Sequence, residues 1–307
     1  MQRREPAMTT IAFIGLGNMG SGMAANQVRA GRTVQAFDLS KDALKRAVSA
    51  GCKPSSSVAE AVSGASIVIT MLPAGQQVKD VYLRDVLPHA SAGALLIDCS
   101  TIDVASARDI AAMATEAGFR PADAPVSGGT AAAEAGTLAF MVGCETRHFD
   151  DVDDALGPMS KAVIHAGEHG AGQAAKICNN MLLGISMIGT CEAFALAKKL
   201  GLEPDRFFEI ARQSSGQCWS VTSYCPVKGV GPETPADRGY EPGFATDMML
   251  KDLKLAQQAA ASVNASTPLG AQAEALYAMF SGMGKGAKDF SAIIDLVAPG
   301  TVKTNRS

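Results

Sequence analysis

An apolar run leads directly into closely spaced glycines near the start of the chain, and few folds accommodate that combination. Residues 11–14 read Ile-Ala-Phe-Ile, and residues 15–20 read Gly-Leu-Gly-Asn-Met-Gly. In this spacing the first glycine makes a tight turn, the second lets backbone approach a pyrophosphate, and the third packs the next helix on the sheet. Phosphate oxygens would accept hydrogen bonds from the N–H groups at that helix's N-terminus. The pattern therefore predicts a strand, a phosphate-binding turn and a helix.

The first half of the chain alternates short apolar runs with longer stretches of helical character. This rhythm is typical of βαβ units, which build a mostly parallel sheet with helices on both faces. The expected strands are Ile11–Ile14, Val34–Phe37, Ile67–Met71 and Ala94–Ile97, with further candidates at Leu138–Val142 and Ala162–His165, and the expected helices are 18–30, 41–50, 76–83 and 104–117.

After Gly172 the pattern changes to long helical stretches. They cover residues 173–200, 204–213, 245–262 and 268–280, with a short one at 290–297. The predicted fold is α/β: a Rossmann-type doubly wound parallel sheet followed by an all-α C-terminal domain. We place the domains at residues 9–170 and 171–307, the second opening with a long apolar helix.

Composition narrows the class of protein. Of the 307 residues 47% are hydrophobic and 19% are charged, which excludes a disordered chain. A net charge of -3 without a long basic run speaks against nucleic acid as a partner. The seven cysteines are odd in number and lack C-x-x-C spacing, so we expect free thiols in a reducing compartment, the cytoplasm. No signal peptide is expected, and Met8 is an alternative start.

The stretch from Ala171 to Ala197 carries only two charged residues, Lys176 and Glu192. Its uncharged apolar run is too short to cross a bilayer, so we expect a buried helix and no membrane partner. Lys176 and Asn180 are spaced i,i+4 and share one helical face. Apolar surroundings would lower the pKa of a lysine toward the range useful for proton transfer. A lysine that merely extends to water is an equally good interpretation of this segment alone.

Three loops are candidates for binding the cofactor. Asp38 ends the second strand, where an acidic side chain accepts hydrogen bonds from an adenosine ribose and favours NAD, although Lys41 could contact a 2′-phosphate. Leu72-Pro73 and Cys99-Ser100-Thr101 each follow a strand on the carboxyl edge of the sheet, where ligands bind in doubly wound folds. Each of the last two, taken alone, is more simply a strand-to-helix connection.

The segment Asp123-Ala-Pro-Val-Ser-Gly-Gly129 is a candidate substrate loop. Ser127 offers a hydroxyl, and Gly128 and Gly129 allow consecutive backbone N–H groups to converge on a carboxylate. A glycine turn with a serine cap explains the same residues. The segment 165–169 matches H-x-x-E-H, but glycines interrupt the helix that a zinc site would need, so we expect no metal.

Several motifs in order resemble the β-hydroxyacid dehydrogenase family over about residues 11–297. They read G-L-G-N-M-G, M-L-P, D-C-S-T-I-D, D-A-P-V-S-G-G, G-A-G-Q-A-A-K-I-C-N-N and K-D-L-K-L-A. The segment S-S-G-Q-C-W-S, followed by Y-C-P, looks most similar to the 3-hydroxyisobutyrate dehydrogenases of that family. One position departs: close relatives carry Asn where Cys225 precedes Pro226, which leaves the substrate open but not the reaction type.

The resemblance implies an active site between a dinucleotide-binding domain and an all-α domain. It makes Lys176 the catalytic lysine. It implies substrate contacts from Ser127, Gly128, Gly129, Asn180 and Trp219, and cofactor contacts from Gly15, Leu16, Gly17, Asn18, Met19, Gly20, Asp38, Leu72, Pro73, Thr101 and Lys251.

The activity implied is NAD-dependent oxidation of 3-hydroxyisobutyrate to methylmalonate semialdehyde, as in valine catabolism, by a homodimer or homotetramer. Tartronate semialdehyde reduction, serine oxidation and imine reduction are the alternatives within the same chemistry. A dinucleotide-binding regulator without catalysis is the alternative from another class.

Overall fold

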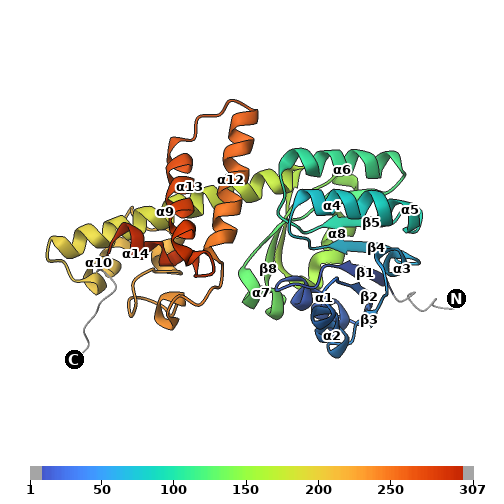
Figure 1. Cartoon of the computed structure of the whole chain (residues 1–307), viewed down its shortest axis with the longest axis horizontal. Coiled ribbons are helices and arrows are strands. Elements are labelled where there is room, and N and C mark those ends of the chain that lie inside the picture. The colour runs from blue at the N-terminus through green and yellow to red at the C-terminus, as the bar shows by residue number, and fades with distance from the viewer. Residues whose placement is uncertain (1–8, 300–307) are drawn as a thin grey trace. The chain divides into compact units, whose positions relative to one another are not determined.

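The chain folds as two compact units that divide between Lys176 and Ile177 (Figure 1). The computed structural model describes residues 9–299, so Met8 and the last residues of the expected second domain lie outside the described part. We call the part up to Lys176 unit 1 and the part from Ile177 unit 2. The division lies inside one helix, slightly beyond the expected boundary at residue 170.

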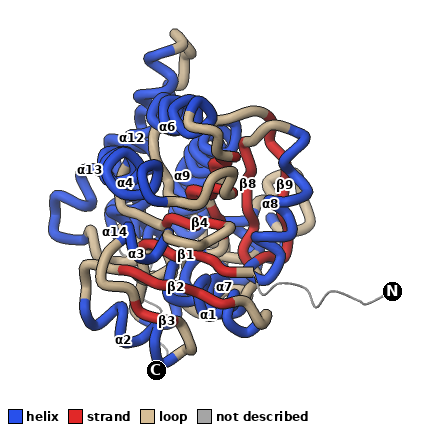
Figure 2. Tube along the Cα trace, turned by 90° about the vertical axis from the view of Figure 1, so that its right-hand side faces the viewer, coloured by secondary structure: helices blue, strands red, loops and turns tan. Residues whose placement is uncertain are grey.

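Unit 1 is built on a mostly parallel sheet (Figure 2). Strand order is β3-β2-β1-β4-β5-β6-β8-β7, with β9 paired to β8. The pairings from β3 to β6 are all parallel, whereas β8 runs antiparallel to β6 and β7. The strands are β1 (Thr10–Ile14), β2 (Thr33–Phe37), β3 (Lys53–Pro54), β4 (Ile67–Thr70), β5 (Leu95–Asp98), β6 (Arg120–Asp123), β7 (Val126–Ser127), β8 (Leu138–Gly143) and β9 (Ser160–Gly167).

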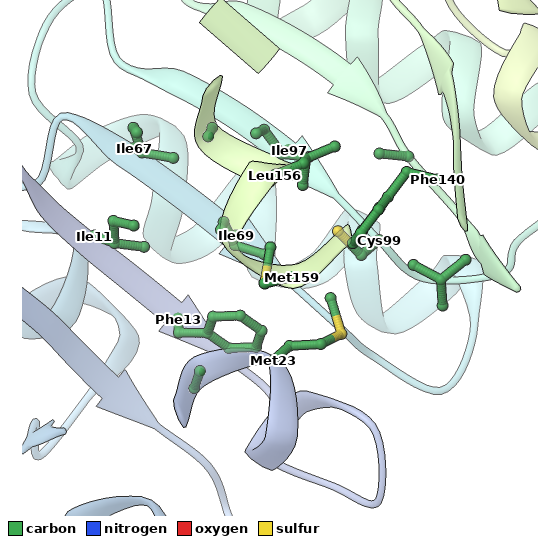
Figure 3. Packing of buried hydrophobic residues seen from close by; sticks show 14 of the residues in the cluster. Ile11, Phe13, Met23, Ile67, Ile69, Ile97, Cys99, Phe140, Leu156 and Met159 are labelled. Atoms are coloured by element: carbon green, nitrogen blue, oxygen red, sulfur yellow. The ribbon is translucent and has the colours of Figure 1, made fainter. Parts of the chain in front are cut away.

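Helices cover both faces of this sheet because alternate strand residues point to opposite sides. Ile11 and Phe13 join one core cluster, and Ala12 and Ile14 join the other. Figure 3 shows the first cluster, with Phe13 beside Met23 of the first helix. The helices are α1 (Gly20–Arg29), α2 (Lys41–Ser49), α3 (Val58–Val62), α4 (Gly75–Val81), α5 (Leu87–His89), α6 (Val104–Glu116), α7 (Gly129–Ala135) and α8 (Phe149–Leu156), with a π-helical turn at Tyr82–Val86.

Unit 2 is helical and has a core of its own. That core includes Met187, Phe194, Leu253, Tyr277 and Phe290, all nearly inaccessible to solvent. The helices are α9 (Ala171–Lys199), which begins in unit 1, α10 (Pro204–Ala211), α11 (Trp219–Thr222), α12 (Thr246–Ser262), α13 (Pro268–Phe280) and α14 (Ile294–Val297).

Helix α9 extends beyond the uncharged apolar run that the sequence analysis judged too short to cross a bilayer. Within residues 9–299 it is the one helix long and apolar enough to cross a membrane by length and composition. A core helix passes the same test, and Met187, Cys191 and Phe194 of α9 are packed in the core of unit 2. Leu182 and Leu196 are exposed on the same helix, so only part of its surface is enclosed by this chain.

The predicted fold class is confirmed, and the differences lie in short elements. The long helices of unit 2 and the first apolar strands agree with the predicted ranges to within a few residues. Eight short strands and helices have no counterpart among the expected ranges: β3, α3, α5, β6, β7, α7, α8 and α11. Strand β6 reads Arg-Pro-Ala-Asp and α8 reads Phe-Asp-Asp-Val-Asp-Asp-Ala-Leu, so neither carries a continuous apolar run to reveal it.

Candidate active site

The glycine-rich turn after β1 fits closely between the ends of its neighbouring strands. Gly15 has φ +94° and donates its N–H to the Phe37 carbonyl at 3.0 Å. A Cβ at Gly15 would overlap the Met71 carbonyl, and one at Gly20 would overlap the Gly15 carbonyl. A Cβ at Gly17, by contrast, would meet no protein atom within 4 Å. The fold therefore requires Gly15 and Gly20, while Gly17 leaves an open approach of the kind a pyrophosphate needs.

Asp38 is tied to the same turn. Its Oδ2 accepts a hydrogen bond from the Leu16 N–H at 2.6 Å, and its Oδ1 accepts one from the Ser40 N–H at 2.7 Å. Leu16 is buried beneath the turn, whereas Gly17 and Asn18 are exposed and Met19 is half-buried. A carboxylate has lone pairs beyond these two bonds, so Asp38 can also accept from ribose hydroxyls.

The two neighbouring loops are joined through a buried serine. Ser100 Oγ accepts from the Leu72 N–H at 2.8 Å and donates to Asp98 Oδ1 at 2.6 Å. The Thr70 hydroxyl donates to the same Asp98 oxygen at 2.7 Å. Pro73 and Thr101, which adjoin this cluster, are exposed and half-buried respectively. The structure therefore brings the expected cofactor residues of unit 1 to one edge of the sheet, and the open Gly17 approach fits a dinucleotide there.

The expected substrate loop lies where β7 ends and α7 begins. Ser127 is the last residue of β7 and is half-buried. Gly128 has φ +137° and Gly129 has φ +72°, conformations that favour glycine over other residues. Helix α7 then packs on α1, where Asn26 Nδ2 donates to the Ala133 carbonyl at 2.7 Å. The candidate substrate loop is thereby held to α1, the helix that follows the glycine-rich turn.

The first turn of α9 is anchored to two strand ends. Asp123, the last residue of β6, accepts from the Gly170 N–H at 2.6 Å and from the Gln173 N–H at 2.9 Å. The Gln173 side chain donates to the Ser100 carbonyl at 2.7 Å and accepts from the Ile102 N–H at 3.1 Å. The bond to Asp123 satisfies the Gln173 N–H, one of the groups that a helix start otherwise leaves without a partner.

Lys176 and Asn180 follow this anchor on α9. Lys176 is 6% exposed and Asn180 is 2% exposed, so neither side chain extends freely into water. The snorkelling interpretation of Lys176 does not fit that burial. Asn180 Nδ2 donates to Asp252 Oδ2 at 2.5 Å, and Asp252 is the neighbour of the expected cofactor residue Lys251 on α12.

Trp219 belongs to a stack of aromatic rings in unit 2. It is half-exposed and lies on Tyr224, with ring centroids 4.6 Å apart and planes 19° apart. The Tyr224 hydroxyl donates to Asp289 Oδ2 at 2.9 Å, and its ring stacks on Phe290. Cys225, where the family resemblance led us to expect Asn, is fully buried in the core of unit 2.

Several residues that hold these groups in place were not expected from the sequence. Asp123 opens the D-A-P-V-S-G-G motif, and Gln173 stands inside G-A-G-Q-A-A-K, so their positions beside named site residues were the available signal. The contacts of Asp252 and Asp289 join segments far apart in sequence, which no local pattern indicates.

Comparisons with known proteins agree with this geometry. Residues 10–167 match the family model described as the NAD binding domain of 6-phosphogluconate dehydrogenase. Residues 170–297 match the one described as NAD-binding of NADP-dependent 3-hydroxyisobutyrate dehydrogenase. The chain therefore belongs to the β-hydroxyacid dehydrogenase family, whose members are NAD(P)-dependent oxidoreductases.

Individual relatives divide between two substrates. A 3-hydroxyisobutyrate dehydrogenase of Pseudomonas aeruginosa is 49% identical over 89% of this chain and 92% of its own length. An NAD-dependent L-serine dehydrogenase of the same organism is 47% identical over 95% and 99%. A solved structure of Mycobacterium tuberculosis 3-hydroxyisobutyrate dehydrogenase with L-serine has a TM-score of 0.92 at 46% identity, covering 95% of this chain and 99% of that one. Matching relatives include bacterial and mitochondrial enzymes.

Replacing glycines in the turn should separate cofactor binding from folding. We expect Gly17→Ala to leave the melting temperature of the ligand-free protein unchanged but to weaken dinucleotide binding at least tenfold, because the new methyl group occupies the open approach. Gly20→Ala should lower the melting temperature, since its Cβ meets backbone. Thermal unfolding and isothermal titration with NAD measure both. Unchanged NAD affinity in Gly17→Ala would contradict the assignment.

The stability of the protein should depend on the ionisation of Asp123. Burial raises the pKa of Asp123 to about 6, with a smaller contribution from Asp98, against the lowering effect of the Gly170 and Gln173 N–H groups. A raised pKa in the folded state means that stability is lost as the pH rises from the unfolded value near 4 through 6. The free energy of unfolding of the wild type, relative to Asp123→Asn, should therefore fall by up to about 3 kcal/mol between pH 4 and pH 7. Urea unfolding of both proteins at the two pH values measures this difference in free energy. A difference that rises with pH would contradict the raised pKa of Asp123.

Proposed function

We propose that this protein oxidises 3-hydroxyisobutyrate to methylmalonate semialdehyde with NAD, and that Lys176 is the general acid and base. The observation that carries the proposal is the burial of Lys176 one turn before Asn180, on a helix whose first turn is bonded to strand ends of the dinucleotide-binding unit. A lysine so held is positioned for proton transfer at a fixed place rather than for contact with water.

The residues of the chain divide the work of the reaction. Ser127 and the backbone N–H groups of Gly128 and Gly129 would bind the substrate carboxylate, and Asn180 would orient the substrate. The neutral amine of Lys176 would take the proton of the hydroxyl group during oxidation and return it during reduction. When bound, the nicotinamide supplies the acceptor or donor of the hydride. Trp219 would contribute an apolar wall and Lys251 a positive charge close to the cofactor.

NAD is the cofactor we infer. Asp38 places a carboxylate on the glycine-rich turn, bonded to the Leu16 N–H. That carboxylate supports binding of ribose hydroxyls and opposes a negatively charged 2′-phosphate. The relative described as an NAD-dependent L-serine dehydrogenase supports the same choice.

L-Serine is the second candidate substrate. It is a β-hydroxyacid, and the serine dehydrogenase relative covers nearly the whole chain. The solved Mycobacterium tuberculosis structure, with a TM-score of 0.92, is described with L-serine. Cys225 favours neither acid, because its side chain is packed in the core of unit 2. We further infer a cytoplasmic homodimer or homotetramer, for which the exposed Leu182 and Leu196 of α9 offer apolar contact area.

Removing Lys176 should abolish turnover without abolishing cofactor binding. We expect Lys176→Ala to lower kcat about 10²- to 10⁴-fold, the range typical of a lost general acid or base, with the Kd for NAD within about threefold of wild type. Lys199→Ala, at the exposed end of the same helix, is the matched control and should behave as wild type. Turnover near that of wild type in Lys176→Ala would sink the assignment of the lysine.

The substrate is tested by steady-state rates with a panel of acids. The panel holds 3-hydroxyisobutyrate, L-serine, tartronate semialdehyde and glycolate, each with NAD or NADP in the direction its oxidation state allows. We expect the highest kcat/KM for 3-hydroxyisobutyrate with NAD. A higher value for L-serine would establish the second candidate, and dinucleotide binding without turnover of any acid would contradict both.

A further inference from the structure

Asp123 connects the candidate substrate loop to the helix that carries Lys176. It ends β6, and Ser127 follows on the same short segment. Its two oxygens accept from the N–H groups of Gly170 and Gln173, at the start of α9. A carboxylate at this position interacts favourably with the positive end of the helix dipole, and its hydrogen bonds are charge-assisted.

The surrounding chain is shaped to admit this carboxylate. A Cβ at Gly143 would overlap Asp123 Oδ1, and a Cβ at Gly172 would lie 2.8 Å from Asp123 Oδ2. Asp123 is 6% exposed. The two glycines therefore allow the strand end and the helix start to close around a side chain that an ordinary surface cap would leave in water.

A second bond set fixes the same helical turn. Gln173 is fully buried and bridges the Ser100 carbonyl and the Ile102 N–H. Ser100 in turn holds the Leu72 N–H. Lys176 follows Gln173 by three residues, so it lies on the same side of α9 nearly one turn later. Rotation or translation of the first turn would therefore displace the amine of Lys176.

We propose that Asp123 is a positioning residue for the proton transfer by Lys176: it fixes the start of α9, and with it Lys176, relative to the Ser127–Gly129 loop. The inference rests on the proposed role of Lys176. Asp123 takes no part in bond making, and its effect passes through the lysine. Burial raises the pKa of Asp123 to about 6, so a neutral amide here escapes the cost of a buried charge and keeps the fold while losing one acceptor.

The test is a double-mutant cycle on kcat with the full-length protein. In the protein that keeps Lys176, Asp123→Asn should lower kcat about 10- to 100-fold, because a small misplacement of a reacting group slows a reaction by about that factor. In the Lys176→Ala background the same change should lower the residual kcat less than threefold, since a missing lysine cannot be displaced. The Kd for NAD should stay within about threefold throughout. Asp123→Ser, which keeps one acceptor, is measured beside it in case the amide variant does not fold.

Asp103→Asn is the matched control. Asp103 caps α6 in the same unit by accepting from the Ser106 N–H at 2.7 Å, and α6 carries none of the proposed site residues. It should leave kcat within about threefold of wild type. An equal loss from Asp123→Asn in both backgrounds, or an equal loss from Asp103→Asn, would overturn the positioning role and leave a purely structural one. Turnover near wild type in Lys176→Ala alone would instead overturn the proposed function.

Discussion

The start of helix α9 is the constraint on which the candidate site depends. Asp123 and Gln173 bond this turn to the ends of β6 and β5. Without Asp123, the N–H of Gln173 in the first turn of α9 would be buried without an acceptor, at a cost of about 1–3 kcal/mol. The bonds therefore serve folding and geometry together, because the residues that satisfy the helix start also fix where its side chains lie.

Hydrogen bonds hold the loops at the carboxyl edge of the sheet, where the other candidate site residues of unit 1 lie. Asp38 holds the glycine-rich turn through Leu16, and Ser100 holds the loop after β4 through Leu72. Ligands of doubly wound sheets bind along this edge, where strand order reverses between β1 and β4. The loop after β5, which holds Leu72 through Ser100, also accepts a hydrogen bond from Gln173 at the start of the helix of Lys176. In unit 2, Asn180 is held by Asp252, which belongs to another helix.

Local patterns predicted the fold class and most long elements, because each leaves a periodic trace in sequence. The glycines at 15, 17 and 20 predicted the turn, and the nearly uncharged stretch after Ala171 predicted α9. Short or acidic elements such as β6 and α8 have no periodic hydrophobic pattern from which they could be predicted. The supporting residues could not be found that way: Asp123 acts on residues 47 and 50 positions later, and Asn180 pairs with one 72 positions away.

Transfer of deuterium from substrate to cofactor tests the central claim most directly. With 3-hydroxyisobutyrate carrying two deuterium atoms at C3, oxidation should deliver one of them to the nicotinamide ring and leave the other in the aldehyde product. Mass spectrometry of the isolated NADH would then show a gain of one deuterium, and Lys176→Ala would form that product far more slowly. NADH without deuterium, or none formed from any β-hydroxyacid, would contradict the account.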